Sequence, residues 1–446
     1  MIAKTISLIK SKPDFFGAVL TGYALIGLNI LIQIFLVPLY LNTLGKYQFG
    51  VLMMLLSFIN YAVIGIGWMS GGVLRVMGEY SANNDREGFY RAYAVSKLIY
   101  VGYAILVSII MVGLCLYLGD EFLGNIPDEY SKSVRLSIIT GAVYFIVLFD
   151  FSVERLALTA MRRQVAAGLL QIISLLVFVV SVIPWLLTGG NLEGVLVCLM
   201  VGIILARAIS WYYWRRTEVS VGWKWIDSGT WPLIKRLTLS MGIGYFLYGI
   251  IFLTMQADVM IIGWLGGAEI AAEFVLVWKI AEIIIQILWK IPEYLSPYLI
   301  KMDTLGENEW LQRTYSKSMR WMTVLSLLAG VIYALFGSWI VQLWVGPAST
   351  PQNNLAYILA GSAIFWLGIA RIPGVFAHTM VRLKSLNTIA GLELIGKLVL
   401  TLVLFPRVGY LAPLIAISAI HVGGIAFAYR LMIKKILTTN VRGKVS

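Results

Sequence analysis

Long apolar runs separated by short polar stretches extend along the whole chain. A window of about 19 residues, the length that crosses a bilayer as a helix, predicts twelve spans. Runs this long without strict alternation can span a membrane only as helices, because each backbone group must be paired within its own segment. The predicted spans are Phe15–Leu41, Gln48–Val73, Ala92–Leu118, Ser133–Ala160, Val165–Leu187, Gly194–Trp214, Leu237–Ile262, Ala271–Ile300, Trp321–Leu343, Leu355–Thr379, Leu386–Phe405 and Tyr410–Leu431.

Basic residues in the loops predict how these helices are oriented. Loops on one side hold most of the lysines and arginines outside the spans, whereas the opposite loops hold little beyond Lys46 and Arg407. Since short basic loops stay in the cytoplasm, both termini are predicted to be cytoplasmic. The basic start, Met1–Phe16, precedes an apolar run too long for a signal-peptide core, so it is interpreted as leading into an uncleaved first helix.

Composition supports the same class of protein. The chain of 446 residues is 60% hydrophobic and 13% charged, with a mean hydropathy of +0.85. Soluble domains are about 45–50% apolar and about 25% charged, so the fold class is predicted to be all-α integral membrane. The net charge of +13 is spread over short loops, which argues against nucleic acid as a partner. The two histidines and two cysteines lack metal-binding spacing, and neither a metal nor a cofactor is expected.

No segment is suited to enzyme chemistry or to ATP. The longest polar stretches, Arg215–Arg236 and Lys301–Arg320, are each about 20 residues, too short for a soluble catalytic domain. None of the Gly-Lys pairs that end at Lys46, Lys397 and Lys444 is followed by the Ser or Thr that a Walker A motif requires. The chain is therefore not expected to be an enzyme, nor to be powered by ATP bound to it.

Two short sequence matches between the halves of the chain suggest that it contains an internal repeat. Leu44-Gly45 follows the first predicted helix and Leu265-Gly266 follows the seventh. Likewise LYLG at 116–119 ends the third and LWVG at 343–346 ends the ninth. They predict two six-helix lobes, residues 1–220 and 221–446, related by a pseudo-two-fold axis along the membrane normal. Chance Leu-Gly pairs in a chain with 42 glycines are the alternative.

Charged side chains interrupt the apolar spans. Each Lys or Arg that faces lipid at a helix centre costs roughly 2.5–3.5 kcal/mol. Six of them would cost on the order of 15–20 kcal/mol, more than the net stability of a typical fold. They must therefore face carboxylates or water inside the protein, which is typical of a protein that moves a polar solute. The basic set is Lys97, Arg207, Lys279, Lys290, Arg371 and Lys397.

The eighth predicted helix carries one polar stripe along its length. Residue spacings of 3, 4, 4 and 3 place its members within roughly 80° of arc. The stripe either lines a water-filled cavity and contacts an anion, or its i,i+3 ion pairs neutralise one another in a helix interface. Pro292 and Pro297 are expected to bend the cytoplasmic end of the helix. The stripe consists of Lys279, Glu282, Gln286, Lys290 and Glu293.

Other basic residues have either a ligand or a side chain as partner. Arg371 lies on the tenth predicted helix, which has no acidic residue, so it is a candidate for binding phosphate unless another helix supplies its acid. Arg75 is either a binding residue or part of a snorkelling i,i+4 pair with Glu79. Glu393 and Lys397 are expected to form a local pair. The predicted substrate-binding residues are Lys279, Lys290, Arg371, Arg75 and Gln286.

Asp150 and Glu154 are like charges four residues apart on the fourth predicted helix. They are either a coupling site for H⁺ or Na⁺, or they form salt bridges with Lys97 or Arg207 on neighbouring helices. Asp258 lies near the outer end of the seventh predicted helix, together with Gln256. The candidates for ion coupling are Asp150, Glu154, Glu282, Glu293 and Asp258.

Several motifs resemble those of one transporter superfamily. They are PLYLNTLG at 38–45, QFG at 48–50, MQADVMIIG at 255–263 and LWVG at 343–346. Together with the helix count, they resemble the Wzx-type flippases that translocate lipid-linked oligosaccharides of O-antigen, capsule and exopolysaccharide. These flippases share a superfamily with the MATE multidrug extruders and the lipid II flippases. The fourteen helices usual in the lipid II branch argue against that branch.

The resemblance implies a V-shaped, MATE-like arrangement around a central cavity, flanked by the first, second, seventh and eighth helices. It implies a flippase of the bacterial inner membrane that carries undecaprenyl-diphosphate-linked oligosaccharide to the outer leaflet by alternating access. An ion gradient of H⁺ or Na⁺ is the expected energy source. Partners would be the glycolipid, the bilayer and a polysaccharide polymerase or chain-length protein.

Two other functions remain open from the sequence. A cation-coupled multidrug extruder of the same fold should have a net acidic lumen, which the lysines of the polar stripe disfavour. A membrane-embedded polysaccharide enzyme would need a sizeable external loop or a histidine with a polar partner, and neither is apparent from the sequence.

Overall fold

The computed structural model describes residues 13–117, 126–216, 230–239, 257–293, 295–380 and 383–442. These residues form helices and turns, and none of them lies in a β-strand, which confirms the predicted all-α class. The chain divides into two compact units, residues 1–243 and 244–446. The predicted lobe boundary at residues 220 and 221 lies outside the described residues.

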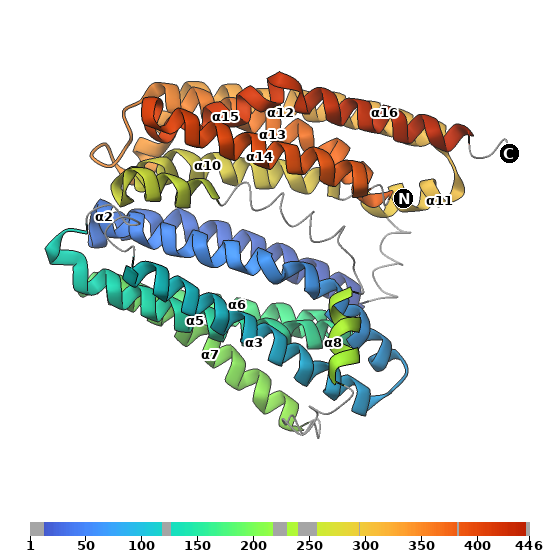
Figure 1. Ribbon diagram of the computed structural model, residues 1–446, viewed down its shortest axis with the longest axis horizontal. Helices are drawn as coiled ribbons and strands as arrows, with labels where there is room; N and C mark the ends of the chain where they lie inside the picture. The colour runs from blue at the N-terminus through green and yellow to red at the C-terminus, as the bar shows by residue number, and fades with distance from the viewer. Residues whose placement is uncertain are drawn as a thin grey trace. The chain divides into compact units, whose positions relative to one another are not determined.

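The N-terminal unit begins with the long helix α2, Pro13–Ala82. Gly45 interrupts it with φ 77° and ψ 169°, a conformation that glycine adopts without steric cost. The interruption falls between the first two predicted spans, so α2 contains both of them. The other helices are α3 (Arg86–Tyr117), α5 (Asp128–Ala160), α6 (Gln164–Leu187), α7 (Leu192–Arg216) and the short α8 (Thr230–Leu239) (Figure 1).

Helix α5 packs against α3 and α7, and α6 packs against α7 and α2. Aromatic residues fill the core between them, as in the pair Phe145 and Phe149, whose ring centroids are 4.4 Å apart. Helix α8 packs on α2 and α3 through the buried residues Leu233 and Leu237. This core positions the inward-facing side chains of α3, α5 and α7.

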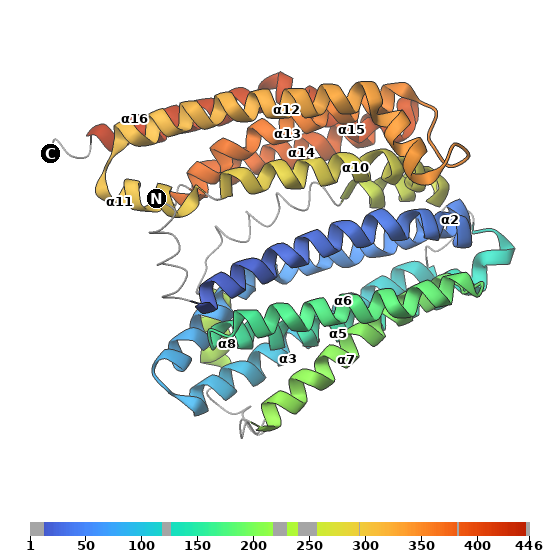
Figure 2. The ribbon, with the colours of Figure 1, turned by 180° about the vertical axis from the view of Figure 1, so that it is seen from behind.

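The C-terminal unit contains the described helix Ala257–Gly266 and a bundle of longer helices (Figure 2). Gly330 of α12 and Gly361 of α13 let these two backbones approach closely, since a Cβ on either glycine would meet the carbonyl oxygen of the other. Helix α10 packs against α13 and α12, while α15 packs against α14 and α13. The elements are α10 (Ala268–Glu293), α11 (Ser296–Leu305), α12 (Asn308–Val345), α13 (Asn354–Thr379), α14 (Leu383–Val408), η2 (Gly409–Leu411), α15 (Ala412–Ile420), the π-helical turn η3 (His421–Ile425) and α16 (Ala426–Arg442).

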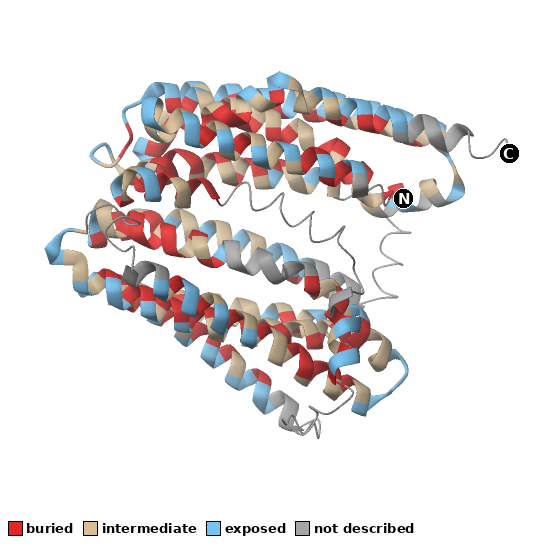
Figure 3. Ribbon diagram, in the orientation of Figure 1, coloured by how far each residue is buried: buried red, intermediate tan, exposed pale blue. Residues whose placement is uncertain are grey.

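Eight helices of the described residues are long and apolar enough to cross a membrane. The predicted count of twelve remains a prediction, because most of the seventh span, Leu237–Ile262, lies outside the described residues. The helices also bear exposed apolar residues, such as Leu335 and Leu343 on α12, where a soluble protein would be polar (Figure 3). The chain is thus an all-α, multi-pass membrane protein.

Two local predictions are corrected. The polar stretch Lys301–Arg320 is mostly helical, because α11 continues to Leu305 and α12 begins at Asn308. Hydropathy detects only the apolar part of a helix and therefore misses a polar extension outside the membrane. The predicted span Ala271–Ile300 ends earlier than expected, since α10 stops at Glu293 and α11 starts at Ser296 with a proline in its first turn.

Candidate functional site

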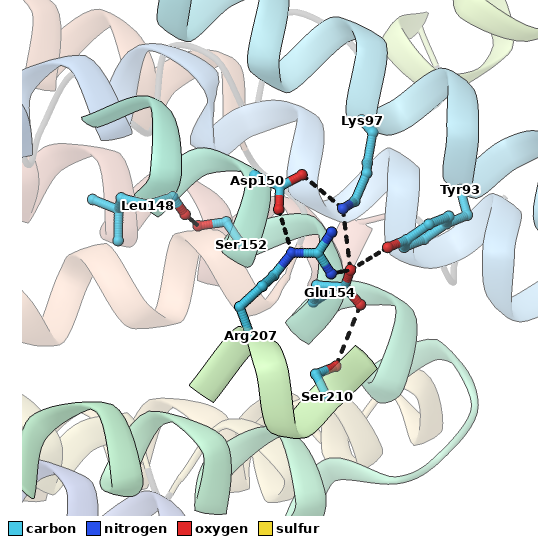
Figure 4. A network of polar contacts seen from close by, with 8 residues as sticks. All are labelled: Tyr93, Lys97, Leu148, Asp150, Ser152, Glu154, Arg207 and Ser210. Carbon is cyan, nitrogen blue, oxygen red and sulfur yellow. Dashed lines mark hydrogen bonds and ion pairs between the residues drawn. The ribbon is translucent and has the colours of Figure 1, made fainter. Parts of the chain in front are cut away.

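Asp150 and Glu154 of α5 lie between two cations from neighbouring helices (Figure 4). Lys97 of α3 places its Nζ 2.6 Å from Asp150 Oδ1 and 3.1 Å from Glu154 Oε1. Arg207 of α7 places its Nε 2.5 Å from Asp150 Oδ2, and its Nη1 contacts Glu154 Oε1. Of the two alternatives derived from sequence, the structure therefore shows the salt-bridged arrangement. The two cations and two carboxylates balance in charge.

Neutral hydrogen-bond donors complete the shell around Glu154, whose side chain is fully buried. Tyr93 donates its hydroxyl to Oε1, and Ser210 donates to Oε2 at 3.4 Å. The ammonium of Lys97 also stands over the Tyr93 ring, 5.3 Å from its centroid. Lys97, Arg207, Tyr93 and Ser210 thus satisfy the buried oxygens of Glu154 within the protein.

In the C-terminal unit, the polar stripe of α10 is paired along its length. Lys279 Nζ lies 3.0 Å from Glu282 Oε2, and Gln286 donates to Glu282 Oε1 at 3.2 Å. About three helical turns further along α10, Lys290 Nζ lies 2.7 Å from Glu293 Oε2. The i,i+3 pairs expected in the interface alternative are therefore present. The cavity alternative remains a prediction.

Arg371 joins this stripe from α13. Its Nη2 donates to Glu293 Oε1 at 2.6 Å, so another helix supplies the acid that α13 lacks. The guanidinium also stacks over Trp289, 4.9 Å from the ring centroid, and Trp289 is held by a 3.0 Å hydrogen bond from its Nε1 to the Leu367 carbonyl. Trp289 directly precedes Lys290 in the chain, but the pattern of polar residues on α10 did not predict its contact with Arg371.

The cluster of Lys279, Glu282, Lys290, Glu293 and Arg371 has unequal charges. Three cations face two carboxylates, which leaves one net positive charge. The Lys290–Glu293 end is the accessible part, with side chains 42% and 37% exposed, whereas Arg371 is 11% exposed. A single carboxylate, Glu293, therefore serves two cations at the more accessible end of the cluster.

Asp258 forms a separate ion pair in the C-terminal unit, away from the α10 stripe. Its Oδ2 lies 2.6 Å from Lys397 Nζ, and both side chains are almost completely buried. This corrects the expected pairing of Lys397 with Glu393 on its own helix, since the close partner is 139 residues away in the chain. Glu393 instead contacts Tyr429 and His421.

Arg75 and Glu79 form the expected i,i+4 pair at the end of α2, with Arg75 Nε 3.1 Å from Glu79 Oε1. Arg236 of α8 contacts the other oxygen of Glu79 and stacks on Tyr80, 5.5 Å from its ring centroid. The hydrogen bond from Arg75, aided by Arg236, lowers the pKa of Glu79 below its ordinary value. Arg75 itself is 65% exposed, and this group links α8 to α2.

No family model matches the chain. The uncharacterized membrane protein EpsK of Bacillus subtilis (strain 168) is 22% identical to it over 363 residues, which are 78% of this chain and 68% of EpsK. Among solved structures, the inward-facing conformation of a multidrug resistance MATE family transporter of the MOP superfamily matches with a TM-score of 0.73 at 11% identity. That match covers 94% of this chain and 95% of the transporter. The chain has the fold of a MATE transporter.

Further structures with this fold agree. An outward-facing MATE transporter matches with a TM-score of 0.62 at 14% identity, over 95% of this chain and 96% of that one. A MOP superfamily transporter from Pyrococcus furiosus, for which a reverse polarity of the binding pocket suggests a different function, matches with a TM-score of 0.56 at 14% identity, over 95% and 96%. The MATE-like fold expected from the sequence is confirmed.

Proposed function

We propose that this chain is a flippase that carries an undecaprenyl-diphosphate-linked oligosaccharide from the cytoplasmic to the outer leaflet of the bacterial inner membrane. The main support is the positively charged α10–α13 cluster on a MATE transporter fold. A diphosphate head group needs cations to replace water, and Lys290 and Arg371 are two such groups that share one carboxylate. Charge-assisted hydrogen bonds from a planar guanidinium suit phosphate oxygens.

Partner exchange at Glu293 gives this cluster a mechanism. In the described state, Glu293 neutralises both Lys290 and Arg371. An incoming diphosphate would take over both cations and displace the carboxylate, and Glu293 would return when the substrate leaves. Trp289 keeps the guanidinium in place during the exchange, because it stacks on Arg371 and is itself held by the backbone. The displaced carboxylate of Glu293, which is 37% exposed, would be solvated by water while the substrate is bound.

Coupling to an ion gradient fits the same exchange. Protonation of Glu293 would free both cations, so an acid-linked cycle could alternate between a proton and a diphosphate at one site. Glu282 likewise contacts Lys279 and Gln286, and its side chain is more buried than that of Glu293. Glu154 and Asp258 are almost completely buried, and Asp150 shares both of its cations with Glu154, so these three acids are weaker candidates for this role.

The proposal is tested by glycolipid translocation in liposomes that contain the purified protein. Removing a hydrogen bond to a charged group costs about 1.5–3 kcal/mol, so Arg371→Ala should weaken diphosphate binding about 10- to 100-fold. Arg313→Ala is a matched control, because Arg313 also pairs with a glutamate, at 2.9 Å, but is 82% exposed on α12. Equal translocation by both variants and the unchanged protein would refute the site.

A cation-coupled drug extruder is the other function found on this fold. It predicts the opposite result, since removal of Arg371 would make the cluster more negative and favour a cationic substrate. Export of a cationic dye by the same liposomes, with no translocation of glycolipid, would decide for this alternative.

A further inference from the structure

Glu393 and His421 form a buried pair in the C-terminal unit that the proposed substrate site does not use. His421 begins the π-helical turn η3 and its side chain has no exposed surface, while that of Glu393, on α14, is 12% exposed. Glu393 Oε1 lies 3.6 Å from His421 Nε2. Tyr429 of α16 donates its hydroxyl to Glu393 Oε2 at 3.0 Å, and Trp366 of α13 stacks on the imidazole with centroids 5.9 Å apart.

The surroundings of the imidazole determine where its protons lie. His421 Nδ1 is 2.8 Å from the carbonyl oxygen of Ile417. A carbonyl only accepts hydrogen bonds, so Nδ1 must carry the hydrogen, and in a neutral ring Nε2 then carries a lone pair. Nε2 is buried without a hydrogen-bond partner, and it faces the oxygen of Glu393. Two acceptors facing each other away from water are unfavourable unless one of them is protonated.

We propose that the Glu393–His421 pair is a proton-binding site of this protein. The pair holds one proton in the described conformation, and the bond from Tyr429 favours an imidazolium beside an ionised Glu393. Loss of that proton leaves a buried carboxylate opposite a lone pair, with one net negative charge. The partial exposure of Glu393 provides the route by which the proton enters and leaves.

The elements that pack around His421 supply the groups that set its charge. Glu393 comes from α14 and Tyr429 from α16, while α13 contributes the uncharged Trp366. Lys397, the next charged residue on α14, is held by Asp258 at 2.6 Å. Lys397 therefore pairs with Asp258, and the proton on the Glu393–His421 pair neutralises the charge of Glu393 instead.

His421 lies in a turn between two helices, so a change in its protonation can affect how those helices are joined. Gly424 has φ 145° and interrupts regular helix between α15 and α16, and π-helical turns occur frequently at functional sites. His421 binds the end of α15 through Ile417, whereas Glu393 bonds to α16 through Tyr429. A change of charge at the pair thus acts on the joint between α15 and α16. Only the coupling of this step to transport rests on the proposed function.

Nitrogen-15 NMR of labelled histidine in the full-length protein tests the proposal. The chain has two histidines, so His378→Gln leaves His421 as the only one. We expect both ring nitrogens of His421 to be protonated near neutral pH, and Glu393→Gln to restore a lone-pair resonance at Nε2. Alternatively the proton lies on Glu393, and infrared spectra then show a carboxylic acid band that Glu393→Gln removes. A neutral His421 without that band from about pH 5 to about pH 8, or a ring protonated at Nε2 alone, would overturn the proposal.

Translocation by the same variants separates this site from the proposed function. If protonation of the pair is coupled to transport, Glu393→Gln should remove the pH dependence of translocation, so that the ratio of the rates at two pH values falls to about one. Translocation that keeps its pH dependence in Glu393→Gln would refute the coupling. A proton on the pair in a protein that moves no glycolipid would refute the proposed function and leave the proton site standing.

Discussion

Removal of the Glu154 charge should destabilise the N-terminal unit strongly. Glu154→Gln keeps the shape of the side chain, but it leaves Lys97 and Arg207 with Asp150 as their one remaining acid in the network. Breaking a buried ion pair from one side costs about 3–5 kcal/mol. Lys97 and Arg207 are 15% and 31% exposed, so solvent screens part of that loss, and we expect about 3 kcal/mol.

A second substitution shows whether charge balance is the cause. Glu154→Gln combined with Lys97→Met leaves one cation and one carboxylate, so its loss should fall short of the sum of the single losses by about 1–3 kcal/mol. Glu309→Gln is the control for the loss of a carboxylate, because Glu309 is 84% exposed and pairs with Arg313 at 2.9 Å. Exposed pairs of this kind contribute about 0–1 kcal/mol.

The measurement is the free energy of unfolding in mixed micelles, obtained by titration with a denaturing detergent and followed by circular dichroism. The reasoning would be refuted by a Glu154→Gln protein as stable as the Glu309→Gln control. It would also be refuted if the losses of the two single variants simply added in the double variant, because the cation and the acid would then act independently.

Three further outcomes follow from other contacts. Asp258→Asn should cost about 3–5 kcal/mol in the same unfolding titration, and addition of Lys397→Met should recover part of it. Gly330→Leu should lower the unfolding temperature, because the new side chain meets the backbone of α13 and overpacking costs about 1–3 kcal/mol. The pKa of Glu79 is lowered by Arg75, so its contribution is present above the ordinary glutamate pKa and is lost as pH falls through the lowered value. Spin labels on α2 and α8 should therefore lie further apart below the lowered pKa of Glu79 than near neutral pH.

The apolar pattern predicted the class of fold because helix formation in a bilayer depends on the segment itself. It placed the interruption at Gly45 between two predicted spans, since polar residues collect where the chain leaves the membrane. It missed the beginning of α12 at Asn308, because a polar helix outside the membrane has no hydropathy signal. The turn at His421–Ile425 was also missed, although two adjacent glycines there marked a weak point in the helix.

Spacing along one helix predicted the pairs of Lys290 with Glu293 and of Arg75 with Glu79, but it wrongly paired Lys397 with Glu393. Lys290 and Glu293 meet because residues three apart share a helix face. The contact of Arg371 with Glu293 spans 78 residues, and that of Lys397 with Asp258 spans 139. Which residues of different helices meet depends on how the helices pack, and residue spacing along one helix carries no information about that packing.

The two units use buried charge in different ways, and this difference indicates where a substrate could act. Glu154 is fully buried and is surrounded by protein donors, so an external anion cannot take its place without breaking that shell. Glu293 is 37% exposed and is shared between Lys290 and Arg371, so a solute can compete for its partners. A ligand can shift a conformational equilibrium only through contacts that differ between states. An anionic substrate would therefore act on the α10–α13 contact, while the network around Glu154 holds α3, α5 and α7 together.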